Sequence, residues 1–398
     1  MFPAVRVLGP EDLRAAFALF AAGIHHDGVD DAGWPAVRDT FHPGRTIGVE
    51  DGGALIGTAT AVPTRTAVPG GAALDTAAVT RVGVRADRTR RGVLSAMMRA
   101  QLDDAAARGE PLASLRASEA RIYGRFGYGV ATRGREVSVR AGGGWRGPVG
   151  GEVRLVTGAD VVPVLAALHE RITLRRAGGI TRPGPWWDRT VGAEVARHRP
   201  LVAAVHTGPD GDDGYALAAP AEGGGGFADR TLRLTDLHAL GADATAGLWR
   251  FLLGIDLVGR VDARLRPPDE PLELLLADPR DCTAGRVEDE TWLRLVVVPA
   301  ALAARTWGAG AAVLLGVHDR LRPGNDGVYR IGAGGAERVR AEPELECDVS
   351  ALAMAYLGDR APSLLASTGW WQVHRADAVA RADALFSTGV LPWCGTYF

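Results

Sequence analysis

One stretch of the chain, residues 77–115, constrains the fold most strongly. A strand pattern over 77–84 is followed by a basic loop, a helical pattern over 93–108 and a second strand pattern over 112–115. The helical pattern buries one apolar stripe, and Gly109 stands where a helix ends in a left-handed residue. Strand, helix and strand in direct succession predict an α/β layer.

The flanking segments extend this layer. Residues 11–22 have the apolar spacing of a helix, and residues 46–50 and 54–62 have strand patterns on either side of a glycine turn. Residues 136–140 alternate as a strand does. Antiparallel strands combined with the strand–helix–strand segment predict a mixed α/β (α+β) first domain.

The chain is too long for one ordinary core, because 398 residues correspond to two or three domains. A glycine-rich segment at 141–148 has few hydrophobic residues and is typical of a linker. The run Gly223 to Gly226 indicates a loop between two strands, and a polar stretch at 281–290 marks a softer boundary. We therefore expect three domains, at about 1–141, 150–284 and 285–398.

Charge and cysteine content exclude several classes of protein. The 45 basic and 47 acidic side chains nearly balance, which argues against a nucleic acid or a membrane surface as partner. Every basic residue is arginine, so a lysine Schiff base and a lysine phosphate loop are excluded. The 3 cysteines lie far apart without metal-ligand spacing, as suits a reducing cytoplasm. We see no signal peptide and no apolar run of about 18 residues that would span a membrane.

The segment from Arg81 to Ser95 has the features of an anion site. A strand ends, a loop rich in arginine follows, and a helix begins at about Gly92. The first N–H groups of a helix have no partners within it and carry the positive end of its dipole. A glycine lets the backbone approach a phosphate closely. The arginines could hold further phosphate charge, although a basic run by itself is usually a solvated face; they are Arg81, Arg85, Arg88, Arg90 and Arg91.

A second segment, residues 117–129, follows the strand at 112–115 and carries a candidate general acid. Three glycines within six residues enforce an irregular turn. Phe126 and Tyr128 are best interpreted as core aromatics packed behind it. Tyr123 lies just beyond the strand, where its hydroxyl could act as a proton donor.

The loop resembles the pyrophosphate loop of the GCN5-related N-acetyltransferase (GNAT) superfamily, which has the pattern Arg/Gln-x-x-Gly-x-Gly/Ala. The strict second glycine is absent here. The resemblance implies that the backbone of Val82, Gly83 and Val84 pairs with the pantetheine arm of acetyl-CoA. It also implies that the pyrophosphate is held by Arg90, Arg91, Gly92, Val93, Leu94 and Ser95.

The string Ser-Glu-x-x-Ile-Tyr-Gly-Arg-Phe-Gly-Tyr-Gly at 118–129 closely resembles the Eis (enhanced intracellular survival) acetyltransferases. The likeness continues through segments 248–256, 269–272, 292–302 and 356–358, and through Phe386 and Phe398 near and at the end. It implies two tandem GNAT-like folds, of which only the first holds acetyl-CoA, and a third domain like sterol carrier protein. It adds Ser118 and Glu119 to the cofactor site and implies a homohexamer.

The family resemblance also implies that the terminal carboxylate, here that of Phe398, enters the active site as the base. Residues 391–398 are apolar and aromatic, unlike a frayed end. The alternative is a terminus that is docked only for packing.

The acetyltransferases of this family act on amines, and a positively charged amine substrate would need an acidic pocket. Asp27, Asp30 and Asp31 follow the first helix, and Trp34 could form a wall of the pocket. A solvated loop is an equally good interpretation of these carboxylates.

Together these patterns and the family resemblance imply a cytoplasmic N-acetyltransferase that uses acetyl-CoA and no metal. The amine would belong to an aminoglycoside, a polyamine or a lysine side chain. His25-His26 lacks further ligands at metal-binding spacing, and Trp186-Trp187 and Trp370-Trp371 are interpreted as core or domain-interface aromatics. The alternative function is a non-catalytic acyl-CoA or lipid-binding protein that uses the third domain.

Overall fold

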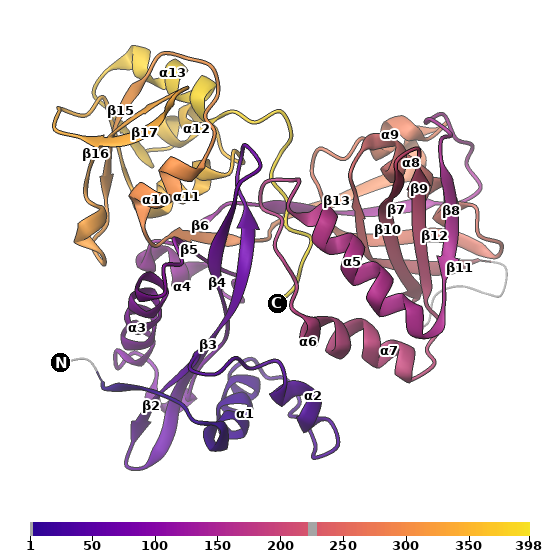
Figure 1. Ribbon diagram of the computed structural model, residues 1–398, viewed down its shortest axis with the longest axis horizontal. Coiled ribbons are helices and arrows are strands. Elements are labelled where there is room, and N and C mark those ends of the chain that lie inside the picture. The colour runs from indigo at the N-terminus through magenta and orange to yellow at the C-terminus, as the bar shows by residue number, and fades with distance from the viewer. Residues whose placement is uncertain (1–2, 222–228) are drawn as a thin grey trace. The chain divides into compact units, whose positions relative to one another are not determined.

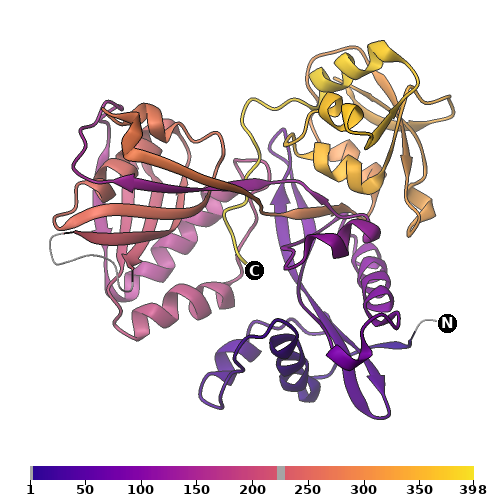
Figure 2. The same ribbon diagram turned by 180° about the vertical axis from the view of Figure 1, so that it is seen from behind.

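A computed structural model describes residues 3–221 and 229–398, so the glycine run at 223–226 lies outside the described residues. The chain divides into two compact units (Figures 1 and 2). The first unit comprises Met1–Ala131, Thr291–Gly389 and Tyr397–Phe398, and the second comprises Thr132–Glu290 and Val390–Thr396.

The first unit is built around a seven-stranded sheet in the order β1-β2-β3-β4-β5-β14-β6. Strands β4 and β5 are parallel, and the other neighbours are antiparallel. The strands are β1 (Val5–Val7), β2 (Thr46–Asp51), β3 (Ala54–Ala67), β4 (Ala73–Val84), β5 (Leu112–Leu115), β6 (Gly129–Val130) and β14 (Trp292–Leu295).

Helices cover both faces of this sheet. They are α1 (Leu13–Gly23), α2 (Trp34–Arg38), α3 (Val93–Ala107) and α4 (Ala120–Tyr123). A Cβ on Gly57 of β3 would meet Val93 and Met97 of α3, whereas a Cβ on Gly83 of β4 would meet Phe20 of α1. Gly83 pairs with Thr58, the neighbour of Gly57, and successive residues point to opposite faces. Therefore α1 and α3 lie on opposite faces of the sheet.

The central hairpin is longer than the sequence pattern predicted. The pairing of β3 with β4 continues from Pro63 opposite Ala77 to Ala67 opposite Ala73. This outer part is rich in threonine and arginine, which obscured the apolar alternation used to predict the strands. The turn that joins the strands contains Gly70 and Gly71, both with positive φ.

The second unit contains another seven-stranded sheet, in the order β13-β7-β12-β11-β10-β9-β8, in which β11 and β12 are parallel. Its strands are β7 (Arg133–Arg140), β8 (Glu152–Val156), β9 (Val202–Gly208), β10 (Gly211–Pro220), β11 (Arg230–Ala239), β12 (Val258–Arg266) and β13 (Cys282–Asp289). Its helices are α5 (Val161–Thr173), α6 (Gly184–Trp187), α7 (Ala193–Ala196), α8 (Ala242–Leu253) and α9 (Leu272–Leu275).

Two strands pair in sheets other than those expected. The alternating residues 136–140, expected in the first domain, belong to β7 and pair with β12 and β13 of the second sheet. The apolar run from Leu293, expected to open the third domain, begins in β14, which lies between β5 and β6 of the first sheet. Alternation identifies a strand but not its partner, because pairing depends on residues far away in the sequence.

The first unit also contains a five-stranded sheet in the order β17-β16-β15-β18-β19. Its strands and helices are β15 (Val313–His318), β16 (Gly327–Gly332), β17 (Gly335–Val339), β18 (Leu345–Asp348), β19 (Trp371–Val373), α10 (Val298–Ala304), α11 (Val349–Tyr356), α12 (Pro362–Ser367) and α13 (Ala376–Phe386). Trp371 is buried in its core as expected, whereas half of the surface of Trp370 is exposed.

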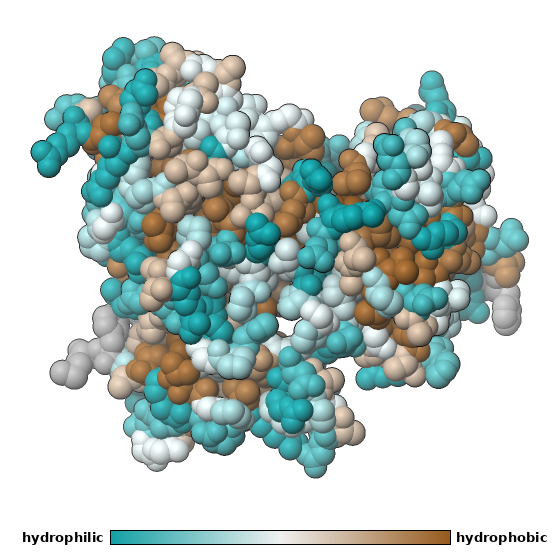
Figure 3. Space-filling model, in the orientation of Figure 1, coloured by the Kyte–Doolittle hydropathy of each residue, from teal (hydrophilic) through white to brown (hydrophobic). Residues whose placement is uncertain are grey.

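The surface mixes residue types. On the face shown in Figure 3, hydrophilic residues surround smaller apolar areas. Within residues 3–221 and 229–398, no helix has both the length and the apolar character needed to cross a membrane.

Candidate functional site

The parallel strands β4 and β5 diverge at the proposed cofactor segment. Their pairing runs from Thr76 opposite Leu112 to Val79 opposite Leu115 and stops there, while β4 continues to Val84. Arg81 has a φ of 53°, and the register with β3 shifts at this point, so β4 carries a bulge. Beyond the bulge, β4 has a described strand neighbour only on its β3 side.

This divergence gives Val82, Gly83 and Val84 an open strand edge. Backbone N–H and C=O groups require partners, and an extended ligand can supply them as an added strand does. Gly83 is buried because the end of α1 packs on it, with Gly23 and Phe20 beside its Cα. A side chain at this position would collide with Phe20, which explains the glycine.

The loop after β4 turns sharply into α3. Arg90 has a φ of 61° and Gly92, the residue before the helix, has a φ of 81°. The first helical residues Val93, Leu94 and Ser95 therefore direct unpaired N–H groups out of the helix end. Such a left-handed turn before a helix N-terminus is a typical anion cradle.

The five arginines of this loop fall into two groups. Arg85 pairs with Asp87 at 2.6 Å, and Arg88 bonds Asp51 at 3.0 Å and Asp87 at 2.7 Å. The guanidinium of Arg81 lies 4.1 Å from the centre of the Phe41 ring. These three side chains are engaged within the protein, contrary to the expectation that all five could hold phosphate.

Arg90 and Arg91 differ from the other three. Both side chains are exposed, and neither has an ion-pair partner among the described residues. Their guanidinium groups are therefore available to an anion at the start of α3.

The candidate acid, Tyr123, ends the short helix α4. Its side chain is 9% exposed, and its ring lies edge-on to that of Tyr128 with centroids 6.1 Å apart. Burial raises the pKa of the Tyr123 phenol above its ordinary value, so the hydroxyl keeps its proton at neutral pH. Ser118 and Glu119 are exposed in the connection from β5 to α4, and Glu119 is the extended residue before that helix.

The last two residues group with the first unit. The ring of Tyr397 lies 3.9 Å from the guanidinium of Arg116, the first residue after β5. Phe398 is partly buried. The end of the chain thus reaches the end of β5, from which the main chain leads to Tyr123.

The acidic residues expected to line an amine pocket lie on an exposed loop. Asp30 accepts a hydrogen bond from the backbone N–H of Gly33 at 2.8 Å, and Asp31 pairs with Arg14. Asp27 is exposed. The carboxylates of Asp30 and Asp31 thus bond within the loop or to α1, which matches the solvated-loop interpretation. The loop begins at the end of α1, where that helix contacts Gly83.

Aromatic and histidine residues lie on and beside the same loop. Trp34 packs between Phe17 and Phe41, each at 6.3 Å between ring centres. His25 and His26 are exposed, and no group of three or more metal-binding side chains occurs within the described ranges.

One residue with a clear role was missed in the sequence. The polar stretch at 281–290 was interpreted as a domain boundary, but its last acid, Glu290, is 1% exposed and accepts hydrogen bonds from the backbone N–H groups of Cys394 and Gly395. Nothing in the local pattern distinguishes Glu290 from the exposed acids before it, because its partners lie more than a hundred residues away.

Known proteins resemble this chain along most of its length. Residues 4–131 and 178–295 each match an acetyltransferase (GNAT) domain, and residues 298–395 match a sterol carrier protein domain. This combination confirms the expected fold class of two GNAT-like folds followed by a sterol-carrier-protein-like domain.

The relatives agree with these domain matches. A Streptomyces avermitilis protein described as an uncharacterized N-acetyltransferase is 39% identical over 88% of each chain. The N-acetyltransferase Eis of Mycobacterium bovis is 35% identical over 96% of this chain and 91% of its own. The crystal structure of Eis1 from Mycobacterium abscessus superposes with a TM-score of 0.89 at 36% identity, covering 99% of this chain and 100% of that one.

These likenesses extend over both units and establish an acetyltransferase enzyme rather than a non-catalytic binding protein. The chain belongs to the Eis family of GCN5-related N-acetyltransferases.

Proposed function

We propose that this N-acetyltransferase transfers the acetyl group of acetyl-CoA directly to a primary amine of a cationic substrate. The class of amine is that of an aminoglycoside, a polyamine or a lysine side chain. The observation that carries the proposal is the convergence at the end of β5, where β4 diverges, the connection to Tyr123 begins and Arg116 holds the ring of Tyr397.

The residues of the first unit fit acetyl-CoA. Val82, Gly83 and Val84 offer an open strand edge for the pantetheine amides. The turn at Arg90, Arg91 and Gly92 and the first N–H groups of α3, at Val93, Leu94 and Ser95, suit a pyrophosphate. Ser118 and Glu119 would lie along the same arm. When bound, acetyl-CoA supplies an activated thioester carbonyl.

The second unit fits acetyl-CoA less well. Only Leu240 and Gly241 separate β11 from α8, whereas eight residues, 85–92, separate β4 from α3. The short connection has no arginine and no room for a phosphate loop. This supports a single cofactor site per chain, within the first GNAT-like domain.

Tyr123 acts as the general acid in this proposal. The amine nitrogen attacks the thioester carbonyl, the new C–N bond forms and the C–S bond breaks. The Tyr123 hydroxyl then gives its proton to the departing sulfur. Its raised pKa makes the phenol a weak acid, so transfer coincides with the growth of charge on the sulfur.

The carboxylate of Phe398 receives the proton of the amine. The pKa values of an α-carboxylate and a lysine-like amine differ by roughly 7, on the order of 9 kcal/mol, so proton transfer before attack would be too costly. The amine therefore attacks from its neutral, desolvated fraction, which has a free lone pair. The carboxylate positions this amine and accepts a proton late, directly or through a water, as the nitrogen becomes positively charged in the attack.

The preference for cationic amines would come from the acidic loop. It begins where α1 touches Gly83, and it carries Asp27, Asp30 and Asp31 on an exposed surface. Carboxylates near the reacting carbonyl raise the local concentration of cations. The family resemblance extends the proposal to a homohexamer in the cytoplasm. Sedimentation equilibrium of the purified protein tests the number of subunits.

The activity is tested by measuring thiol release from acetyl-CoA with three amines, an aminoglycoside, spermidine and a lysine-containing peptide. We expect turnover with at least one of them and none with a polyol of similar size. Saturable acetyl-CoA binding without turnover on any of the three would contradict the proposal.

A further inference from the structure

In the second unit, as in the first, two parallel strands stop pairing before they end. We call the space between the unpaired ends of β11 and β12 the strand gap; it resembles the proposed cofactor edge of the first unit. The parallel pair β11–β12 is joined through α8, and its pairing ends at Leu234 opposite Ala263. Strand β11 continues beyond this point through Asp236 and His238, and β12 continues to Arg266. In the first unit the corresponding edge of β4 has no strand partner among the described residues, whereas the gap in the second unit is occupied.

The C-terminal segment of the chain fills this gap with Trp393. The indole N–H of Trp393 donates to the backbone carbonyl of Leu265 at 2.6 Å, and its ring centre lies 4.8 Å from that of His238. Arg266 lies 4.9 Å from the same ring. Leu265 has a φ of 53°, an uncommon value for leucine, and it is the carbonyl of this strained residue that meets the indole.

The backbone after Trp393 is held by a buried carboxylate. Glu290 accepts hydrogen bonds from the N–H groups of Cys394 at 3.0 Å and Gly395 at 2.7 Å. The hydroxyl of Thr132 donates to the same carboxylate at 2.9 Å. Hydrogen bonds from backbone N–H groups to a charged acceptor are stronger than neutral ones.

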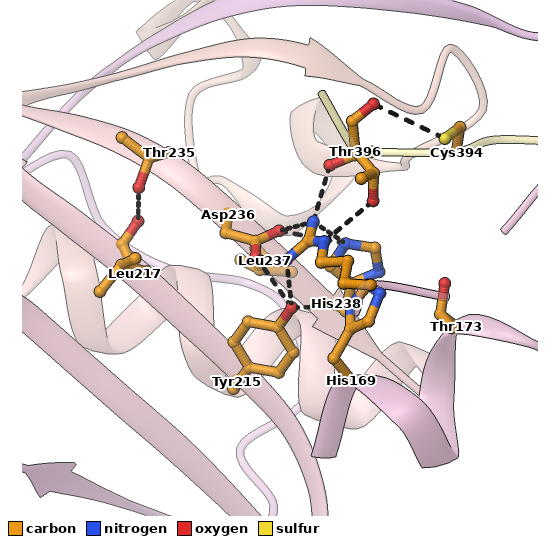
Figure 4. Close-up of polar contacts among 12 residues, drawn as sticks. His169, Thr173, Tyr215, Leu217, Thr235, Asp236, Leu237, His238, Cys394 and Thr396 are labelled. Carbon is orange, nitrogen blue, oxygen red and sulfur yellow. Dashed lines mark hydrogen bonds and ion pairs between the residues drawn. The ribbon is translucent and has the colours of Figure 1, made fainter. Parts of the chain in front are cut away.

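Arg182 holds the next part of the segment. It donates to the carbonyl of Gly395 at 3.1 Å and to the hydroxyl of Thr396 at 3.0 Å. The guanidinium forms a buried ion pair with Asp236, which also accepts a hydrogen bond from the Tyr215 hydroxyl at 2.8 Å. Figure 4 shows Tyr215 and Asp236 on one side of this network and Thr396 on the other.

The electrostatics of this network keep it charged. Burial is the largest single influence on Asp236 and opposes its ionisation, but the charge of Arg182, the nearby His238 and the hydrogen bonds from both side chains together outweigh burial and hold the pKa of the carboxyl well below its ordinary value. The ion pair of Arg182 with Asp236 is therefore charged at neutral pH, and Arg182 donates to the C-terminal segment as a cation.

Such an arrangement is unusual for the end of a chain. Terminal residues are usually poorly ordered, and buried charges are costly unless they are fully paired. Here the buried charges Glu290 and Arg182 bond the main chain of an irregular segment, Trp393–Thr396, that belongs to no sheet. Two further residues span at most about 7 Å, so fixing Thr396 restricts the carboxylate of Phe398 to a small volume.

We propose that Glu290 and Arg182 are positioning residues for acetyl transfer, and that the strand gap of the second GNAT-like domain holds the C-terminal segment in order to aim the carboxylate of Phe398. This inference rests on the proposed function of that carboxylate. It gives the second domain a role in the reaction, and it assigns its strand gap to Trp393 instead of a second acetyl-CoA.

The first test is Glu290→Gln, which keeps the shape but replaces one acceptor oxygen by an N–H₂ group facing backbone N–H. We expect kcat to fall about 10- to 100-fold, because misplacement by about 1 Å has effects of that size. Acetyl-CoA affinity, measured by calorimetry, should change less than about 2-fold. Asp281→Asn is the matched control, since Asp281 is a buried carboxylate of the same unit that pairs with Arg140. It should leave kcat unchanged.

A double-variant cycle separates this inference from the proposed function. The second change is an extension of two glycines after Phe398, which displaces the carboxylate. If the extension alone leaves kcat unchanged, the proposed base is wrong. If the extension lowers kcat but Glu290→Gln does not, the base stands and the positioning role is overturned.

The remaining outcomes concern the combination of the two changes. We expect Glu290→Gln to have no further effect on kcat in the extended protein, because it acts through the carboxylate. An equal fall in kcat in both backgrounds would show a general structural effect and would overturn the inference.

A gentler variant covers the case in which Glu290→Gln fails to fold. Thr396→Val keeps the side-chain shape and removes the acceptor for Arg182. The rate at which carboxypeptidase A releases Phe398 from the folded protein, followed by mass spectrometry, reports tail mobility without reference to activity. We expect about 10-fold faster release from Thr396→Val than from the unmodified chain, in line with the loss of about one hydrogen bond to a charged group. An unchanged release rate would overturn the anchoring role.

Discussion

The guanidinium of Arg116 lies 3.9 Å from the centre of the Tyr397 ring, so the penultimate residue of the chain stacks on the residue that follows β5. A cation over an aromatic face is attracted by the negative charge of the ring. This contact brings residues from the two ends of the first unit's sequence together at the strand from which the chain leads to Tyr123. Four predictions follow from the arrangement around it and from the buried network of the second unit.

The position of the terminal carboxylate should control the rate of acetyl transfer. Extending the chain by two glycines moves the charge away from Phe398, and we expect kcat to fall about 100-fold, as general base catalysis contributes at least that much. Steady-state kinetics with a saturating amine measures the change. Val390→Thr serves as a control, because it changes an exposed residue of the C-terminal segment without moving the carboxylate. It should leave kcat unchanged. Unchanged turnover in the extended protein would remove Phe398 from the mechanism.

Tyr123→Phe should lower kcat by about 100- to 1,000-fold with little change in the affinity for acetyl-CoA, because only the proton donor is lost. Tyr128→Phe is the matched control, since the two rings contact each other and both are buried. The comparison is made by stopped-flow detection of free thiol. Similar effects of the two substitutions would indicate loss of packing instead of loss of an acid.

The two groups of arginines should respond differently to substitution. Arg90→Gln and Arg91→Gln should each weaken acetyl-CoA binding about 10-fold, as expected for the loss of a charge-assisted hydrogen bond to phosphate. Arg85→Gln and Arg88→Gln should have smaller effects, because these side chains already pair with Asp87 and, for Arg88, with Asp51. Isothermal titration with CoA measures the four affinities. Equal weakening by all four would contradict the assignment of Arg90 and Arg91.

His169, one of the buried histidines of the second unit, should make the stability of that unit depend on pH. Nε2 of His169 donates to the backbone carbonyl oxygen of Ile180 at 3.1 Å, and Nδ1 lies 3.0 Å from the hydroxyl oxygen of Tyr215. Burial, aided by the charge of Arg182, holds the pKa of His169 well below its ordinary value. Below a pH of about 6.5 the unfolded chain gains a proton that the folded chain refuses, so the free energy of unfolding falls by up to about 1.4 kcal/mol per pH unit.

His169→Gln tests this dependence. The variant should unfold at a lower temperature at pH 7.5, and its Tm should fall less steeply than that of the unmodified chain between pH 7.5 and 5.5. Differential scanning calorimetry at several pH values measures both slopes. Parallel curves for the two proteins would show that His169 does not cause the dependence.

The sequence by itself determined the elements that depend on neighbours along the chain. The helix that begins at Val93, the strand at 112–115 and the short turn that presents Tyr123 all arise from periodic apolar residues and glycines within a few positions. The family resemblance, carried by such local strings, gave the fold class and the enzyme class. Both are confirmed by the domain matches and by the relatives.

Only the tertiary structure decided which distant groups meet. It placed β14 between β5 and β6, divided the five arginines between β4 and α3 into paired and unpaired groups, and brought Glu290 and Arg182 to a segment at the far end of the chain. Local propensity carries no information about these contacts, because ion pairs and strand pairing are selected by free energy over the whole fold. A buried glutamate and an exposed one look the same in a sequence, and their surroundings alone separate them.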